Sequence, residues 1–321
     1  MRKAFFLAPL AAAMVLAAGL SGAAAETRVT LKSAKSTSSY YQMMVQLSEA
    51  LKAGSKGGLI ATVEESQGSV QNVMEAAKRP GNYVFTTPPV LIKLAHEGKG
   101  KFKADPAYDE IRSLFPIPYL TMHWVVRADS GINSLSDLAG KDFIPGGKGS
   151  FGYRQTVGLL EKLGIADKVN IVDVELNAAV PALKNRKVAG FATAGSYPAP
   201  NVMEAAAGTK IKLLGISDED YEKMGKKGAL IDIPAGTYPG VDAPVRTLTL
   251  PVGAYTTTRM DDATAYAVTK AFWEQRAEMA KANAWWGGVT GQTVGSLGAK
   301  LHPGALKYYM EASMAIPAAL K

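Results

Sequence analysis

Cysteine is absent from the 321-residue chain and only three histidines occur, which removes two common kinds of site. Without cysteine, the protein forms no disulfide bond and no thiolate metal site, so its stability must come from packing. His96, His123 and His302 stand far apart, and none has the partner four residues away that a helical zinc site requires. We therefore expect no bound metal.

Long apolar runs are also missing after residue 20, so no later segment is expected to span a membrane. The one run, residues 4–20, follows a basic start and ends in small residues before Glu26. This pattern is typical of a secretory signal peptide, residues 1–25, cleaved after Ala25. A membrane anchor is the alternative, although the run is short for a span. We expect a periplasmic protein of 296 residues after removal of the first 25.

The surplus of positive charge is small and scattered. The formal charge of +8 at pH 7 falls to +6 without Arg2 and Lys3, and basic runs are as short as Lys226-Lys227. A stripe of charge for nucleic acid is therefore not expected. A modest attraction of anionic solutes is the better interpretation.

A glycine-rich stretch, residues 146–154, reads GGKGSFGYR and lies between an apolar strand, residues 142–144, and a helix. Four glycines in seven positions let the backbone turn sharply and approach a ligand closely. The unpaired N–H groups and the positive dipole end of the helix point at this turn. Arg154 adds a full charge near the first helical turn. Together these features predict an anion site.

No catalytic arrangement accompanies this stretch. It lacks the Gly-Lys-Ser/Thr ending of a P-loop, and Ser150, which stands among Gly149, Phe151 and Gly152, lacks the Gly-x-Ser-x-Gly pattern of a nucleophile elbow. Glu64 and Glu65 are neighbours at a strand end, where successive side chains point to opposite faces. We therefore expect a protein that binds and does not catalyse, with no cofactor.

The order of elements predicts an α/β fold. Strands are expected at residues 28–32, 59–63 and 83–85, and helices at 40–51 and 70–78. This βαβαβ order indicates a mostly parallel sheet covered by helices. Ligands of such sheets bind at the carboxyl ends of the strands.

A second α/β unit begins with the strand at residues 122–126 and contains the glycine-rich stretch. Two late elements, a strand at 247–252 and a helix from Asp261 to about Ala282, could return to the first unit. This order favours two lobes with a cleft between them.

Four consecutive hydroxyl residues follow the first strand: Ser36, Thr37, Ser38 and Ser39. Ordinary N-capping of the next helix accounts for one of them. The others are candidates for contact with a ligand.

Five short motifs occur in a fixed order along nearly the whole chain after residue 25. They are SYY at 39–41, QGSVQN at 67–72, VRADSGI at 126–132 with LAGK at 138–141, IPAGTYPG at 233–240, and LHPGA at 301–305. In this combination the chain resembles the TAXI family of TRAP transporter solute-binding subunits. It departs from the family pattern at Phe151-Gly152, where a glycine and a threonine are usual, and at Ser38-Ser39, where glycines are common.

The resemblance implies a type II periplasmic binding fold, with two α/β lobes, a two-strand hinge and a ligand cleft. Lobe I would comprise residues 26–121 and 254–321, and lobe II residues 122–253. It also implies a TRAP permease of the inner membrane as partner, and a small carboxylate ligand such as glutamate, glutamine, a 2-oxoacid or a dicarboxylate. We expect a monomer.

The expected mechanism is capture by closure of the lobes over the ligand. Its carboxylate would rest on backbone N–H groups of Gly149 and Ser150, with Arg154 adding a charge-assisted bond. The candidate ligand-binding residues are Ser36, Thr37, Ser38, Ser39, Tyr40, Tyr41, Gln67, Gly68, Thr87, Gly149, Ser150, Phe151, Tyr153, Arg154, Thr193, Ala194, Gly195 and Ser196. Two alternatives remain, a receptor of an ABC importer and an exported sensor or interaction module.

Overall fold

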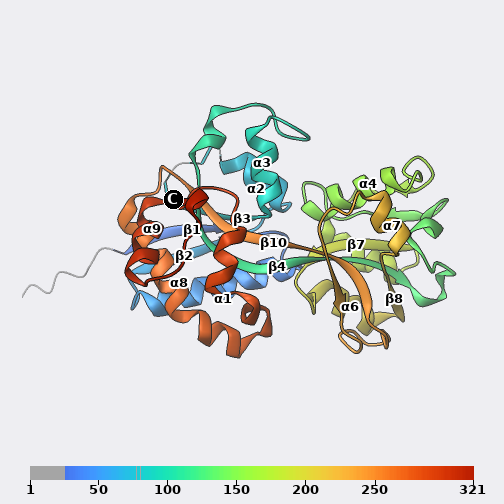
Figure 1. Cartoon of the computed structure of the whole chain (residues 1–321). Coiled ribbons are helices and arrows are strands. Elements are labelled where there is room, and N and C mark those ends of the chain that lie inside the picture. Colours follow the sequence, from blue (N-terminus) through green and yellow to red (C-terminus); the bar gives the residue numbers. More distant parts are fainter. Residues whose placement is uncertain (1–25, 77, 80) are drawn as a thin grey trace, which may run out of the picture.

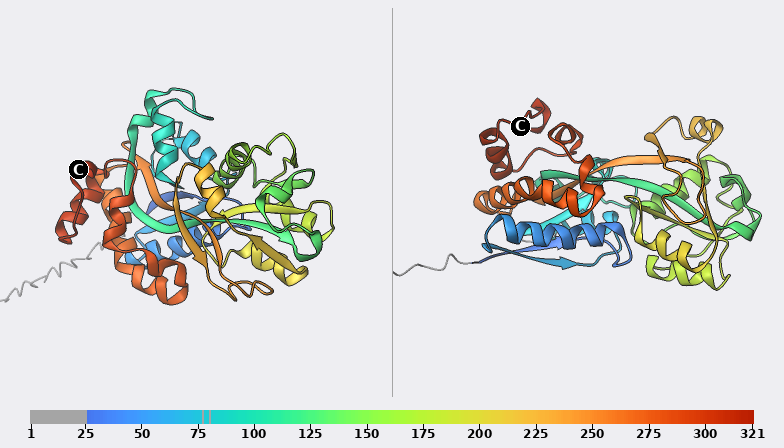
Figure 2. Two further views of the ribbon diagram at one scale, coloured as in Figure 1. Left: turned by 45° about the vertical axis from the view of Figure 1, so that its right-hand side comes forward. Right: turned by 90° about the horizontal axis from the view of Figure 1, so that it is seen from below.

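The computed structural model describes residues 26–76, 78–79 and 81–321, so the expected signal peptide, residues 1–25, lies outside the described residues. Two α/β bodies lie next to each other, and two long strands pass from one to the other (Figure 1). Figure 2 shows the same division from two further directions. We call the body that holds residues 26 and 321 lobe I, and the other body lobe II.

Lobe I is built on parallel strands in the order β2–β1–β3. Its elements are β1 (Thr27–Lys32), α1 (Ser39–Gly54), β2 (Leu59–Glu64), α2 (Ser69–Ala76), β3 (Tyr83–Thr87), α3 (Pro89–His96), α8 (Asp262–Ala282) and α9 (Pro303–Glu311). The C-terminal helices α8 and α9 return to this lobe, where α8 packs against α1 (Figure 1).

Lobe II continues the sheet with parallel strands in the order β7–β5–β6. Its elements are β5 (Asp142–Ile144), α4 (Phe151–Lys162), β6 (Asn170–Ile171), α5 (Ala179–Lys184), β7 (Gly190–Gly195), α6 (Pro200–Gly208), β8 (Ile211–Leu214), α7 (Asp218–Lys223) and β9 (Ala229–Ile233). Short 3₁₀ helices occur at Pro106–Glu110, Ala128–Ser130, Leu135–Leu138, Leu176–Ala178, Ala284–Gly288, Gly291–Ser296 and Ala318–Leu320.

The connection between the lobes consists of two antiparallel strands, β4 (Ile111–Arg127) and β10 (Val245–Thr257). In lobe I, β10 pairs with β3 through residues 253–255, and in lobe II, β4 pairs with β7 through residues 121–126. The β4–β10 register shifts between Leu250 and Val252, opposite the segment of β4 that holds Pro118, and again between Ala254 and Tyr255. Proline has no N–H to donate to the ladder, which fits the first shift. This irregularity lies where the strands leave one lobe for the other.

The core follows the alternation of strand residues. Trp124 and Val125 are both fully buried, although they point to opposite faces of the sheet. Trp124 joins a large apolar cluster that includes residues of both lobes, and Val125 joins a smaller one within lobe II. Both faces of the lobe II sheet are therefore covered.

These features confirm the predicted fold class, two α/β lobes joined by two strands. The long C-terminal helix starts where the sequence indicated, with the Asp261 carboxylate accepting from the Thr264 N–H. The sequence pattern placed a strand only at 122–126, whereas β4 begins at Ile111 and continues through Pro116 and Pro118. Among the described helices, none has the length and apolar character needed to cross a bilayer.

Candidate functional site

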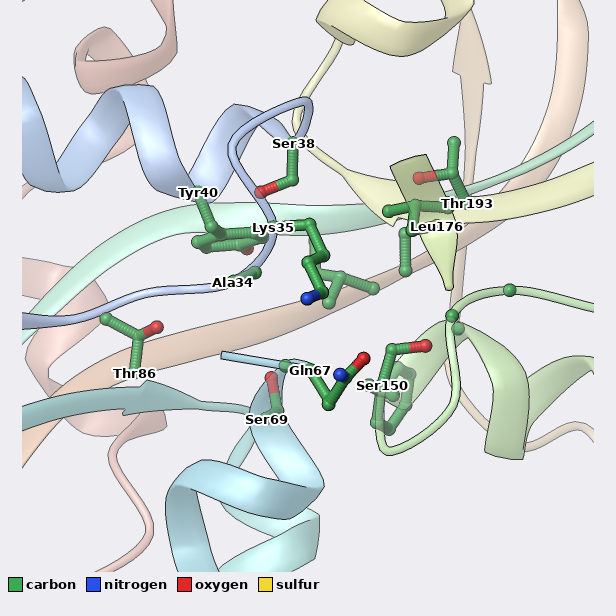
Figure 3. Close-up of a pocket in the computed structure, with 17 residues that line it drawn as sticks. Ala34, Lys35, Ser38, Tyr40, Gln67, Ser69, Thr86, Ser150, Leu176 and Thr193 are labelled. Atoms are coloured by element: carbon green, nitrogen blue, oxygen red, sulfur yellow. The ribbon is translucent and has the colours of Figure 1, made fainter. Parts of the chain in front are cut away.

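A cavity lies between the lobes, where the loops after β1, β2, β5 and β6 meet the ends of β3 and β7 (Figure 3). Its empty space, counted with the part open to solvent, is about 480 Å³. Lobe I lines it with Ala34, Lys35, Ser38, Tyr40, Gln67, Gly68, Ser69 and Thr86; the crossing strand and lobe II contribute Leu120, Gly146, Gly147, Ser150, Phe151, Gly152, Leu176, Thr193 and Ala194. Every loop that surrounds it follows the carboxyl end of a strand, as expected for this class of sheet.

Helices α1 and α4 begin at this cavity. The Ser38 hydroxyl oxygen accepts from the Tyr41 N–H at 3.2 Å and caps α1, and the Ser150 hydroxyl oxygen accepts from the Tyr153 N–H at 3.0 Å and caps α4. Because each oxygen already accepts from its own helix, its hydrogen remains to donate to a ligand. The N–H groups of the first residues of a helix have no intrahelical partner, so both helix ends favour an anion.

The N-terminus of α2 is closed by the opposite lobe. The Gly149 carbonyl accepts from the N–H groups of Val70 and Gln71, at 3.1 and 3.4 Å. Gly149 has φ +78°, and a Cβ there would lie 2.9 Å from the Gln67 Cβ. At Gly68, with φ +119°, a Cβ would lie 3.0 Å from the Ser150 Cα. Only glycine fits at both positions, so the structure shows the two lobes in direct contact beside the cavity.

Among the described residues that line the cavity, Lys35 is the one with a charged side chain (Figure 3). Its side chain is 13% exposed, and its Nζ lies 2.7 Å from Glu175 Oε2 of lobe II. Glu175 Oε1 accepts from Gln67 Nε2. The Lys35 hydrogen bond holds the pKa of Glu175 below its usual value. A lobe I cation is thus held in the cavity by a lobe II carboxylate at its rim.

The model of the NMT1-like family matches residues 31–312 of the sequence, which is most of the chain. This chain belongs to the NMT1-like family.

The fold of this NMT1-like chain is also found among solved binding proteins. The periplasmic binding protein BugD aligns over 89% of this chain and 94% of its own, with 13% identity and a TM-score of 0.58. MatC from Rhodopseudomonas palustris, with bound malate, aligns over 81% and 89%, with 13% identity and a TM-score of 0.54. R. palustris Rpa4515 with adipate aligns over 77% and 83%, with 15% identity and a TM-score of 0.51. At these identities the similarity shows a shared fold, that of periplasmic solute-binding proteins.

The structure brings eight of the expected ligand-binding residues to the cavity of this NMT1-like protein. They are Ser38, Tyr40, Gln67, Gly68, Ser150, Phe151, Thr193 and Ala194. The remaining ten do not line it: Ser36, Thr37, Ser39, Tyr41, Thr87, Gly149, Tyr153, Arg154, Gly195 and Ser196.

Several of these ten instead connect the lobes. The Ser196 N–H donates to Ser39 Oγ at 3.0 Å, and the Ser196 hydroxyl donates to the Tyr119 carbonyl at 2.6 Å. Thr37 Oγ1 donates to Asn177 Oδ1 at 2.8 Å. In the hydroxyl run after β1, Ser38 lines the cavity, and Thr37 and Ser39 contact the other lobe. The Ser36 N–H donates to Glu65 within lobe I.

Arg154 lies in the first turns of α4, as the sequence predicted, but its side chain is outside the cavity lining. Partial burial lowers the pKa of its guanidinium group. Phe151 is 2% exposed and forms part of the cavity wall. In the described structure the charge of the site comes from Lys35 rather than from Arg154.

Sequence reasoning missed Lys35. It sits alone between Ala34 and the hydroxyl run at the end of β1. A signal was present, because a cation at the carboxyl end of a parallel strand occupies the place where ligands of such sheets bind.

The histidines lie away from the cavity. His123 Nε2 lies 2.8 Å from the Tyr238 hydroxyl, which in turn accepts from the Ala199 N–H at 2.8 Å. Burial lowers the pKa of His123 to about 4, so the ring is neutral near pH 7. His302 caps α9 and accepts from the Gly304 N–H. Within the described residues, no three His, Cys, Asp or Glu side chains gather as metal ligands would.

Proposed function

We propose that this NMT1-like protein is an extracytoplasmic receptor that captures a small organic anion by closure of its two lobes. The observation that carries the proposal is the Lys35 ammonium group in a cavity lined by hydroxyls and helix N-termini. Ammonium, hydroxyl and N–H groups all donate hydrogen bonds, and a carboxylate only accepts them. The site matches an anion with acceptor oxygens.

The strength of such a site is adequate for transport. Each charge-assisted hydrogen bond contributes about 1.5–3 kcal/mol, and micromolar binding corresponds to about 8 kcal/mol. Lys35 and three or four neutral donors reach that value after the costs of ordering. Closure requires only that ligand favour the closed state over the open one by a few kcal/mol.

The proposal includes the finer expectations from the sequence. The ligand is a small carboxylate, and the receptor belongs to the TAXI group and delivers it to a TRAP permease without catalysis. Lobe I comprises residues 26–121 and 254–321 and lobe II residues 122–253, and residues 1–25 direct export to the periplasm. The five ordered motifs support the TAXI assignment, and the fold and the cavity support the binding role.

A thermal-shift screen of the purified protein against carboxylates, followed by calorimetry, tests the role. We expect at least one small carboxylate to raise the melting temperature and bind with micromolar affinity. Lys35→Met should weaken that binding at least tenfold, because it removes the charged donor. Lys148→Met is the matched control: Lys148 also pairs with a carboxylate, Asp173, but its side chain is 75% exposed and outside the cavity lining. An equal loss of ligand affinity in both variants, or the absence of thermal stabilisation by every carboxylate tested, contradicts the proposal.

A further inference from the structure

Gln67, a residue of the cavity lining, carries a hydrogen-bond acceptor that no donor of the described residues reaches. Among the described residues, Gln67 Oε1 is a buried side-chain oxygen without a hydrogen-bond partner, and Gln67 lines the cavity. In Figure 3 the Gln67 carboxamide lies beside Ser150 and points toward the end of the Lys35 side chain. Buried acceptors are rarely left unpaired, so we expect a donor from outside the protein to bind this oxygen.

The orientation of the Gln67 carboxamide follows from its neighbour. Its Nε2 donates to Glu175 Oε1, and a reversed amide would place its oxygen against that carboxylate oxygen. The backbone of Gln67 is held as well, because its N–H donates to Gln71 Oε1 at 2.6 Å. Gly149 packs close to the Gln67 Cβ from the opposite lobe. The free oxygen is thus a fixed feature of the closed lobes.

The other polar side chains of the cavity lining are an ammonium group and hydroxyls, all of which can donate. Lys35 carries the ammonium group, and the oxygens of Ser38 and Ser150 already accept from helix N–H groups. Thr193 Oγ1 accepts from Asn201 Nδ2 at 3.0 Å, so its hydrogen is also left to donate. These donors suit the acceptor oxygens of an anion and do nothing for Gln67 Oε1.

We infer that the ligand carries a hydrogen-bond donor, a hydroxyl or an amino group, beside its anionic group, and that Gln67 Oε1 accepts from it. This inference rests on the proposed function. A ligand without the donor leaves Gln67 Oε1 buried and unpaired, which typically lowers affinity about tenfold to a hundredfold. Gln67 therefore selects hydroxy- or amino-carboxylates over plain carboxylates of the same length.

Calorimetry with matched carboxylate pairs tests the selection. The pairs are lactate and propionate, malate and succinate, and glutamate and glutarate, which differ by one hydroxyl or amino group; the first two test a hydroxyl and the third an amine. For the best-bound pair, we expect wild-type protein to favour the donor-bearing member at least tenfold. Gln67→Met keeps the side-chain length and removes both polar atoms. We expect it to bring the two affinities within about twofold, mainly by weakening the donor-bearing member.

Gln155→Met is the matched control, because Gln155 lies on α4 outside the cavity lining, and it should keep the wild-type preference. Equal affinities within every pair in wild-type protein, or a preference that survives Gln67→Met, overturn the inference and leave the receptor role standing. Failure of every carboxylate to bind overturns the receptor role and this inference with it.

Discussion

The two lobes contribute different chemistry to the cavity between them. Lobe I supplies the ammonium group of Lys35 and the carboxamide of Gln67, whereas lobe II supplies the glycine-rich turn at Gly146 and Gly147 and the start of α4. Both walls present a helix N-terminus, α1 in lobe I and α4 in lobe II, and in the described lining the lobe I wall adds the charged side chain. Under the proposed function, lobe I would supply the charge for the ligand and lobe II would close over it.

Two lysines of lobe I, Lys32 and Lys35, have carboxylate partners in different places. In lobe I, Lys32 is buried with a side chain 4% exposed and pairs with Glu64 and Glu75, while Arg79 also binds Glu64. These partners all belong to one lobe, so opening leaves them intact. Lys35 is different, because its partner Glu175 belongs to the other lobe. Opening would free Lys35 for a ligand and leave the lobe I ion cluster unchanged.

The largest expected effect concerns stability in acid. It separates the uncharged His123–Tyr238 pair of lobe II from the ion cluster of lobe I, which contains Lys32, Glu64, Glu75 and Arg79. The pKa of His123 is about 4 in the folded protein against 6.5 for the free side chain, so the unfolded chain binds the proton first as pH falls. Stability should therefore decrease from about pH 6.5, by on the order of 3 kcal/mol at pH 4. Burial lowers the pKa of His302 too, which acts in the same sense.

Denaturant unfolding at several pH values measures this decrease. His123→Gln should be less stable at pH 7 but lose less stability between pH 6.5 and 4. The hydrogen bond from Arg79 leads the causes that lower the pKa of Glu64 to about 2, so its contribution is lost only below about pH 4.5. If the free energy of unfolding of His123→Gln falls with pH as steeply as that of wild-type protein, His123 is not the cause of the decrease.

The next effect concerns the closing wall of lobe II. Gly149→Val adds a branched side chain where even a Cβ would meet the Gln67 Cβ at 2.9 Å, at a φ of +78° that valine avoids. We expect at least a hundredfold loss of ligand affinity by calorimetry, because the lobes cannot close. Gly158→Ala is the control, since a Cβ at this position on α4 meets nothing within 4 Å. It should leave affinity unchanged and stabilise α4 by up to about 1 kcal/mol. Wild-type affinity in Gly149→Val would show that this contact is not needed for closure.

The smallest expected effect concerns the exposed contacts between the lobes. Thr37→Val removes the hydrogen bond to Asn177 at the surface, outside the cavity lining. Because water replaces an exposed hydrogen bond, we expect ligand affinity to change by less than about threefold. A tenfold loss would place the hydroxyl run after β1 among the ligand contacts, as the sequence pattern first suggested.

Much of the architecture could be predicted from local patterns. Apolar periodicity and glycine-rich turns placed β5, α4 and α8 within a few residues, and the order of strands and helices indicated two lobes. The length of β4 could not be predicted, because Pro116 and Pro118 read as strand breakers. The strand tolerates them through its irregular pairing with β10, which the sequence of β4 does not reveal.

The candidate site also has features that local sequence patterns predict and features that depend on the tertiary structure. The sequence by itself indicated that one residue of the run Ser36–Ser39 caps the next helix, because N-capping is a local interaction, and the structure identifies it as Ser38. The sequence also determined that a glycine-rich turn precedes α4. Only the tertiary structure decided which cation enters the cavity. Side chains on a helix point in directions about 100° apart, so the face of α4 that packs on the sheet leaves Arg154 outside the lining. Lys35 lies in the cavity lining with its ammonium group 2.7 Å from Glu175 Oε2 of the other lobe, a contact between residues far apart in the sequence that local patterns do not encode.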